Sequence, residues 1–145
     1  MNINSSIRPP KWFWIVSTLA LLWNLMGVFA YLADTFMTIE DLGTLPQDQR
    51  LLYESRPVWV TSAYAIAVWG GTLACIALLF RKKWARTLFL VSLIGVIAQN
   101  LYQFLMSNTF EVYGTSAMFL PIMVIVISIA LLLFSKSCYS KGWIS

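Results

Sequence analysis

Residues 57–80 read PVWVTSAYAIAVWGGTLACIALLF, a run of 24 residues without a charged side chain that is enclosed by Arg56 and Arg81. An α-helix rises about 1.5 Å per residue and the hydrocarbon core of a bilayer is about 30 Å thick, so this run is long enough to cross a membrane with some tilt. Within lipid every backbone N–H and C=O group must be paired inside its own segment, which an isolated strand cannot achieve. The run therefore predicts a transmembrane helix.

Three further runs of the same kind follow from the spacing of the charged residues. Uncharged stretches of 22, 24 and 24 residues lie between Lys11 and Asp34, between Arg86 and Glu111, and between Glu111 and Lys136. Only 11% of the 145 residues are charged and 59% are apolar, against roughly 25% and 45–50% in soluble domains. We therefore expect one transmembrane domain over residues 1–145, an all-α bundle of four helices at about 12–33, 57–80, 84–106 and 116–134, with an outer loop at 34–56.

The basic residues gather on one side of the four predicted helices. That side carries eight of them: Arg8, Lys11, Arg81, Lys82, Lys83, Arg86, Lys136 and Lys141. The other side carries Arg50 and Arg56 with all six acids: Asp34, Glu40, Asp41, Asp48, Glu54 and Glu111. Short loops rich in Lys and Arg stay in the cytoplasm, so both termini are predicted to be cytoplasmic. The net charge of +4 then faces lipid headgroups, and nucleic acid is not an expected partner.

The outer loop contains two sequence signals for a helix start. One runs from Thr38 to Asp41 and the other from Thr44 to Gln47, each with a hydroxyl followed three residues later by an acid or amide. We expect a short amphipathic helix over residues 46–54, with its leucines on the membrane or on the bundle. It is interpreted either as a folded connector or as a lid over a binding site.

The second predicted helix carries a stripe of small side chains at spacings of about four residues. Its members are Ala63, Ala67, Gly70, Gly71 and Ala74. Such a stripe allows another backbone to approach closely. We therefore expect this helix to pack most tightly, either inside one bundle or between subunits.

Polar side chains within the predicted spans are the clearest functional signal, because each one needs a partner or water in the membrane. Asn24 lies near the middle of the first span, and Gln99 and Gln103 are four residues apart on one face of the third. Helical rise brings these amides to similar depths. The predicted cluster comprises Asn24, Asp34, Tyr64, Gln99, Asn100 and Gln103.

Two interpretations of this cluster are open. In the first, it lines an outward-facing pocket or pore. Amides are neutral and both donate and accept hydrogen bonds, so such a pocket suits water, sugars or other uncharged polar solutes better than ions. In the second, the amides fasten the helices together, each interhelical bond contributing about 0.6–2 kcal/mol.

Enzymatic chemistry has little support in the sequence. The chain has no histidine, no paired carboxylates within a span, no Gly-rich phosphate loop and no metal-ligand spacing. Cys75 and Cys138 both fall toward the predicted cytoplasmic side, where thiols stay reduced, so no disulfide is expected. We predict a protein that is not an enzyme and that needs no cofactor.

The stretch KWFWIVSTLALLWNLMGVFAYL at residues 11–32, followed by an acidic loop and by PVWVTSAYAIAVWGG at residues 57–71, resembles a group of small four-span bacterial inner-membrane proteins. Some members of that group are labelled sugar transporters. The resemblance implies a bacterial inner-membrane location and carries no site residues.

The leading hypothesis is an oligomeric transporter or channel-like protein for a small uncharged polar solute. Four helices enclose little space, so a conducting path is expected between subunits. The alternative is an accessory or assembly subunit that binds a larger membrane protein through its small-residue stripe and amides. Membrane lipids, further copies of the chain, or that larger protein are the expected partners.

Overall fold

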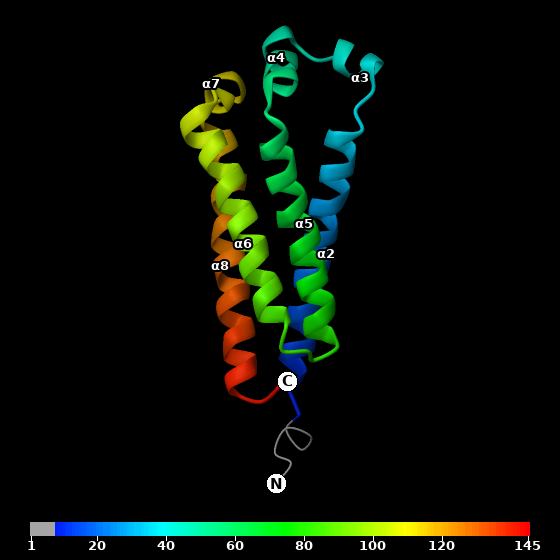
Figure 1. Ribbon diagram of the computed structural model, residues 1–145, viewed down its shortest axis with the longest axis vertical. Helices are drawn as coiled ribbons and strands as arrows, with labels where there is room; N and C mark the ends of the chain where they lie inside the picture. The colour runs from blue at the N-terminus through cyan, green and yellow to red at the C-terminus, as the bar shows by residue number, and fades with distance from the viewer. Residues whose placement is uncertain (1–7) are drawn as a thin grey trace.

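The computed structural model describes residues 8–145, which form helices and no strand (Figure 1). Four long apolar helices are each long enough to cross a membrane, so the chain is a membrane-embedded protein, as the sequence predicts. They are α2 (Lys11–Thr35), α5 (Val58–Leu79), α6 (Ala85–Leu101) with a π-helical continuation at Tyr102–Met106, and α8 (Phe119–Ser140), which follows a 3-10 turn at Thr115–Met118.

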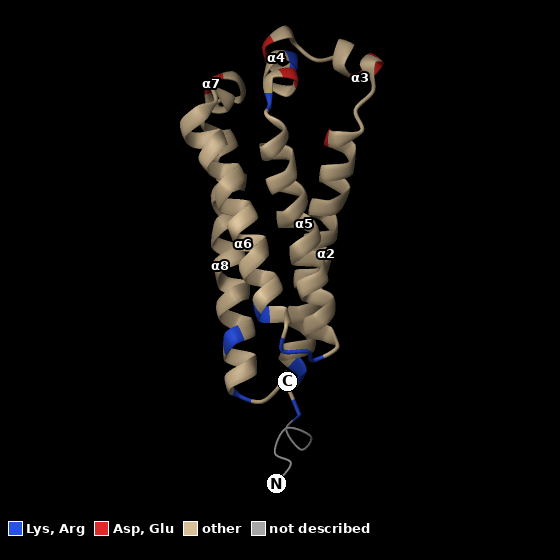
Figure 2. Cartoon of the chain, in the orientation of Figure 1, with Lys and Arg blue, Asp and Glu red and all other residues tan. Residues whose placement is uncertain are grey.

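Three short helices lie at one end of the bundle. They are α3 (Ile39–Gly43) and α4 (Gln47–Ser55), which connect α2 to α5, and α7 (Thr109–Tyr113), which lies between α6 and α8 (Figure 1). The acidic side chains of the described residues gather at this end and most basic ones at the opposite end (Figure 2). These are called the acidic end and the basic end below. The first residues of α2 and the last of α8 both lie at the basic end (Figure 1).

The two helix-start signals of the connecting segment have different outcomes. At the first, the Thr38 hydroxyl accepts a hydrogen bond from the Asp41 N–H at 3.1 Å, and the Asp41 carboxylate accepts one from the Thr38 N–H at 3.2 Å. The second prediction is wrong in detail, because α4 begins after Pro46 without a side-chain cap. Thr44 instead donates its hydroxyl to the Asp41 carbonyl at 2.6 Å, which closes the end of α3.

The fourth span extends beyond its predicted end near residue 134. Lys136 marks the end of the uncharged run, but it is exposed on the helix surface, where a long side chain reaches water while its backbone stays helical. The helix ends at Ser140 and is followed by Gly142, whose φ of 78° suits glycine. The Trp143 N–H donates to the Cys138 carbonyl at 2.9 Å, as in a Schellman motif.

Helix α5 is the most buried of the four long helices, and it packs against both α2 and α6. All five residues of its small-residue stripe are buried. On the facing side of α6, a Cβ added to Gly95 would lie 2.7 Å from the Ala63 carbonyl oxygen and 2.9 Å from the Ala67 nitrogen. The Ser92 hydroxyl donates to the Ala67 carbonyl at 2.6 Å across the same contact. Backbone therefore meets backbone between α5 and α6.

Helices α2 and α8 lack the extensive packing that joins α2 to α5, α5 to α6 and α6 to α8. They meet at the basic end through an aromatic cluster of Trp12, Phe13, Phe134 and Trp143. The Phe13 and Phe134 ring centroids are 6.0 Å apart, and those of Trp12 and Trp143 are 5.3 Å apart. The first pair is stacked and the second is edge-to-face, and both arrangements are attractive at such distances. The first and last helices are thus joined at one end of the bundle.

Residues 142–145 cross the basic end and close it. The Arg81 guanidinium donates through Nε to the Trp143 carbonyl at 2.7 Å, and the Ser145 N–H donates to the Arg81 carbonyl at 3.0 Å. Between these bonds the Ile144 side chain is only 1% exposed. The aromatic cluster and this segment together fill the space between the helices at the basic end.

Candidate functional site

A cavity of about 550 Å³ lies between the four long helices, each of which contributes to its walls. Asp34 and Arg56 line it at the acidic end, and Asn24, Ser92 and Ser128 line it deeper in the bundle. Asn24 is roughly 20 Å along α2 from Lys11 at helical rise. The cavity therefore reaches from the acidic end to about the middle of the membrane-spanning region, above the aromatic cluster.

All six residues of the predicted polar cluster line this one cavity. Asn24 and Asp34 come from α2, Tyr64 from α5, and Gln99, Asn100 and Gln103 from α6 and its continuation. Their sequence spacing already placed them at compatible depths, and the folded chain turns them toward a shared space.

The hydrogen bonds of these side chains bear on the two interpretations. Asn24 donates through Nδ2 to the Ala20 carbonyl at 2.9 Å within its own helix and to Cys75 Sγ of α5 at 3.4 Å. The buried Asn100 donates to the Val96 carbonyl of its own helix at 2.7 Å. Of these two amides, only Asn24 thus joins two helices.

Three side chains of the cluster form no hydrogen bond with any described residue. They are Tyr64, Gln99 and Gln103. Each is partly buried, and a polar group held away from water without a partner costs free energy. Their free donors and acceptors therefore favour water or a polar ligand inside the cavity.

Gly71 of the small-residue stripe fixes the position of the deepest amide. A Cβ added there would overlap Asn24 Oδ1 and would lie 3.2 Å from Ser92 Oγ. The absence of a side chain at this point gives the Asn24 amide its place between α2 and α5. Asn24 is thereby held at the inner part of the cavity.

Helix α6 changes its winding where the amides lie. Residues 102–106 are π-helical, directly after Gln99 and Asn100, and Gln103 belongs to this turn. The wider turn is closed by Ser107, whose hydroxyl donates to the Gln103 carbonyl at 3.3 Å. Single π-helical turns inside α-helices occur frequently at functional sites. The amide face of α6 therefore coincides with the least regular part of a spanning helix.

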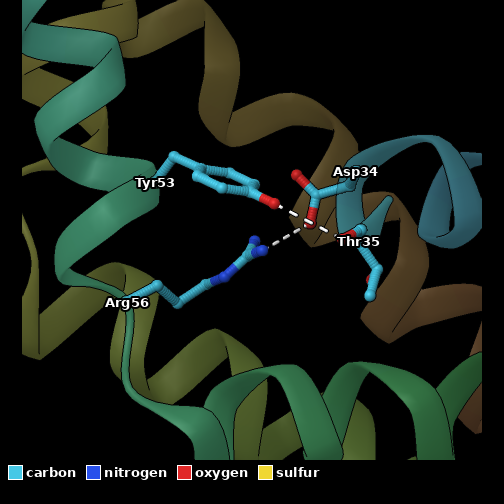
Figure 3. Close-up of polar contacts among 4 residues, drawn as sticks. All are labelled: Asp34, Thr35, Tyr53 and Arg56. Atoms are coloured by element: carbon cyan, nitrogen blue, oxygen red, sulfur yellow. Dashed lines mark hydrogen bonds and ion pairs between the residues drawn. The ribbon is translucent and has the colours of Figure 1, made fainter. Parts of the chain in front are cut away.

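An ion pair stands at the mouth of the cavity (Figure 3). Arg56 Nη2 lies 2.6 Å from Asp34 Oδ2, and the two side chains are 20% and 29% exposed. Tyr53 donates its hydroxyl to the Thr35 carbonyl at 3.5 Å, and the Arg56 guanidinium lies 5.2 Å from the Tyr53 ring centroid. These contacts tie the end of α2 to α4 and to the start of α5.

A second cavity, of about 250 Å³, lies above this ion pair and beneath α4 and α7. It shares Asp34, Arg56, Gln99 and Gln103 with the larger cavity. We call this second cavity the vestibule. Tyr113 of α7 also lines it. Burial, and secondly the negative charges of Asp34 and Asp48, raise the pKa of the Tyr113 phenol. The ion pair therefore separates the vestibule from the main cavity.

Several residues that line the cavity were not part of the predicted cluster, among them Trp23, Arg56 and Ser128. Ser128 is the only polar residue between Phe119 and Phe134, and its hydroxyl donates to the Val124 carbonyl at 2.7 Å. A lone serine that bonds its own helix gives no sign of which way it faces. The sequence does not distinguish Arg56 from a member of a solvated surface ion pair, or Trp23 from a residue that only packs between helices. For Arg56 the one signal in the sequence was its position directly before Pro57, because this places its charge at the start of a predicted span.

No protein-family model, curated protein or solved structure matches the chain. The resemblance to small four-span bacterial proteins therefore stays a prediction.

Proposed function

We propose that the protein is a transporter or channel-like protein for an uncharged polar solute, which it binds in the main cavity. One observation carries this proposal: unpaired amide and phenol groups line a space in which Asp34 and Arg56, the only charged side chains that line it among residues 8–145, are paired with each other. An ion entering the cavity would lose its hydration without a free counter-charge. A neutral solute exchanges hydrogen bonds to water for hydrogen bonds to the amides.

The closed basic end and the position of the cavity toward the acidic end support a solute path that opens at the acidic end. In this proposal the Asp34–Arg56 ion pair is the outer gate, and the aromatic cluster with Trp143 and Ile144 is the inner gate. Alternating access needs two such barriers on either side of a site near the bilayer midplane. The resemblance of the sequence supports a bacterial inner membrane as the proposed location. Because most basic residues lie at the basic end, both termini are proposed to be in the cytoplasm (Figure 2).

The orientation is tested with a topology reporter. Alkaline phosphatase fused after Ser145 is expected to be inactive in a bacterial host, because the enzyme needs the periplasm to form its disulfides. The same reporter inserted after Gly43, at the exposed end of α3, is expected to be active. An active fusion after Ser145 with an inactive one after Gly43 would reverse the proposed orientation.

Transport is tested by uptake of radiolabelled glycerol, xylitol and glucose into proteoliposomes. Uptake of at least one solute is expected to exceed that of protein-free liposomes. Gln99→Leu and Asn24→Leu are expected to lower it about 5- to 100-fold, because a buried hydrogen-bonding partner is worth about 1–3 kcal/mol. Leucine keeps a similar size, so the loss reports on the amide.

Thr72→Val is the matched control for these variants. Thr72 is a buried polar residue of α5 that bonds the Val68 carbonyl of its own helix at 2.8 Å and does not line the cavity. Its uptake should equal that of the native chain. Uptake at the level of empty liposomes for every solute would reject transport.

The proposed accessory function has less support from the structure. Its docking stripe on α5 is buried against α2 and α6 of the same chain, which leaves it unavailable to a partner helix. Oligomers were expected because four helices usually enclose little space. One chain encloses about 550 Å³ by itself, so the cavity does not require a second subunit. Crosslinking in native membranes decides between the two functions, and a stoichiometric heterologous membrane partner would favour the accessory function.

A further inference from the structure

The main cavity also reaches the side of the bundle, between α2 and α8. Met26 of α2 and Leu120 of α8 both line the cavity, and yet their side chains are 66% and 59% exposed. The same two helices are joined only weakly outside the basic end. In a membrane this opening lies at the depth of the acyl chains, because Met26 is well inside a spanning helix.

The walls of the cavity divide into a polar and an apolar part. On the far side, α6 and α5 carry Gln99, Asn100 and Tyr64, while Asn24 of α2 and Ser128 of α8 add polar groups deeper in the cavity. The residues beside the opening are apolar: Met26, Leu120 and Val124. A ligand that satisfied both parts would carry a polar group at one end and a hydrocarbon chain at the other.

The size of the cavity agrees with such a ligand. A water molecule takes about 30 Å³ in the liquid, so 550 Å³ corresponds to roughly eighteen waters. This is far more than a three-carbon polyol needs, and it falls in the range of sites for larger organic ligands. The polar group would be uncharged, because Asp34 and Arg56 neutralise each other.

We propose that the ligand is a single-chain amphiphile with an uncharged, hydroxyl-bearing headgroup, which enters between α2 and α8 from the leaflet at the acidic end. This inference rests on the proposed binding of an uncharged polar group in the cavity. The headgroup bonds to Gln99 and Asn100, and the chain leaves the cavity between Met26 and Leu120.

The two ends of this ligand act in different ways. A chain that moves from the bilayer to the opening gains little free energy, because lipid tails are as apolar as leucine side chains. Affinity comes from the headgroup hydrogen bonds, which form away from water. Substitutions among the amides should therefore weaken binding, and substitutions at the opening should hinder access.

Trp23 provides a direct probe, since it lines the cavity three residues before Met26, on the same face of α2. The full chain is placed in phosphatidylcholine nanodiscs and titrated with 1-(9,10-dibromostearoyl)glycerol, whose bromines quench indole fluorescence on contact. A saturable component of the quenching is expected at a low mole fraction of the brominated monoacylglycerol in the nanodisc lipid. This component should be missing in Trp23→Phe. Gln99→Leu is expected to raise the half-saturating mole fraction at least about tenfold.

The opening is tested by the double variant Met26→Phe/Val124→Phe, which should reduce the saturable component. Its control is Leu22→Phe/Leu133→Phe, since these residues are exposed on the same two helices and do not line the cavity. The control should quench like the native chain. Equal quenching in the two double variants would overturn entry between α2 and α8.

Two further outcomes separate this inference from the proposed function. Quenching that rises linearly with mole fraction and is unchanged in Trp23→Phe overturns the amphiphile, while amide-dependent uptake of glycerol, xylitol or glucose leaves solute transport standing. Equal saturable quenching by dibrominated phosphatidylcholine, added in the same amounts, overturns the uncharged headgroup. The absence of both quenching and uptake rejects both proposals.

Discussion

Replacing Gly95 by alanine is expected to lower the free energy of unfolding by about 2–3 kcal/mol, as forced overpacking does in a close-packed interior. The added methyl group would lie 2.7 Å from the Ala63 carbonyl oxygen and 2.9 Å from the Ala67 nitrogen. Both are backbone atoms of α5, so no side-chain rotation relieves the overlap and the two helices must separate. The loss is measured by titrating the detergent-solubilised protein with a denaturing detergent and following helix content.

Gly70→Ala is the matched control on the other side of the same contact. Its nearest neighbours would be atoms of Ser92 at 3.5 Å, an ordinary van der Waals distance. Alanine is favoured over glycine in helices by up to about 1 kcal/mol, so this variant should be neutral or slightly stabilised. Equal destabilisation of Gly70→Ala and Gly95→Ala would contradict the close backbone approach at Gly95.

Reversing the charge of Arg56 is expected to have the second large effect. Arg56→Glu places a second carboxylate beside Asp34, where the native pair is 2.6 Å apart and less than a third exposed. Loss of the attraction and gain of a repulsion are expected to cost about 1–3 kcal/mol, more than for an exposed surface pair. If the pair is the outer gate, proteoliposome uptake should also change, because the end of α2 is no longer held to the start of α5.

The double variant Asp34→Arg/Arg56→Glu restores opposite charges and is expected to recover most of the lost stability. Arg50→Glu serves as the control, since Arg50 lies on the neighbouring α4 and forms no ion pair with any described residue. Thermal unfolding in detergent and uptake are measured for all variants. An Arg56→Glu variant no different from Arg50→Glu would exclude the ion pair as a structural link.

The four spans could be predicted closely because charges interrupt the apolar sequence at lengths that match a bilayer. Three of the predicted spans agree with the observed helices within a few residues, counting the π-helical turn as part of the third. The predicted boundaries differ from the observed ones where a charged residue does not end a helix. Lys136 lies within α8, and Glu111 lies within the unpredicted α7. A charged residue can extend from a helix to the headgroups, so charge alone does not fix a boundary.

The polar cluster could be predicted because depth follows from counting residues along a helix. Asn24 and Gln99 were expected at similar depths, and both line the main cavity. The opening between α2 and α8 could not be predicted, because lipid-facing and buried faces of a spanning helix are equally apolar. Leu120 and Leu132 look alike in the sequence, but the first is 59% exposed and the second 8%.

The aromatic contact between Phe13 and Phe134 gives the first and last helices a pivot at the basic end. Met26 lies thirteen residues beyond Phe13, which corresponds to roughly 20 Å at helical rise. A change of about 10° in the tilt of α2 would displace Met26 by roughly 3.5 Å, close to the spacing of carbon atoms in contact. Leverage of this kind could widen or shut the side of the bundle while the tight α5–α6 contact stays rigid.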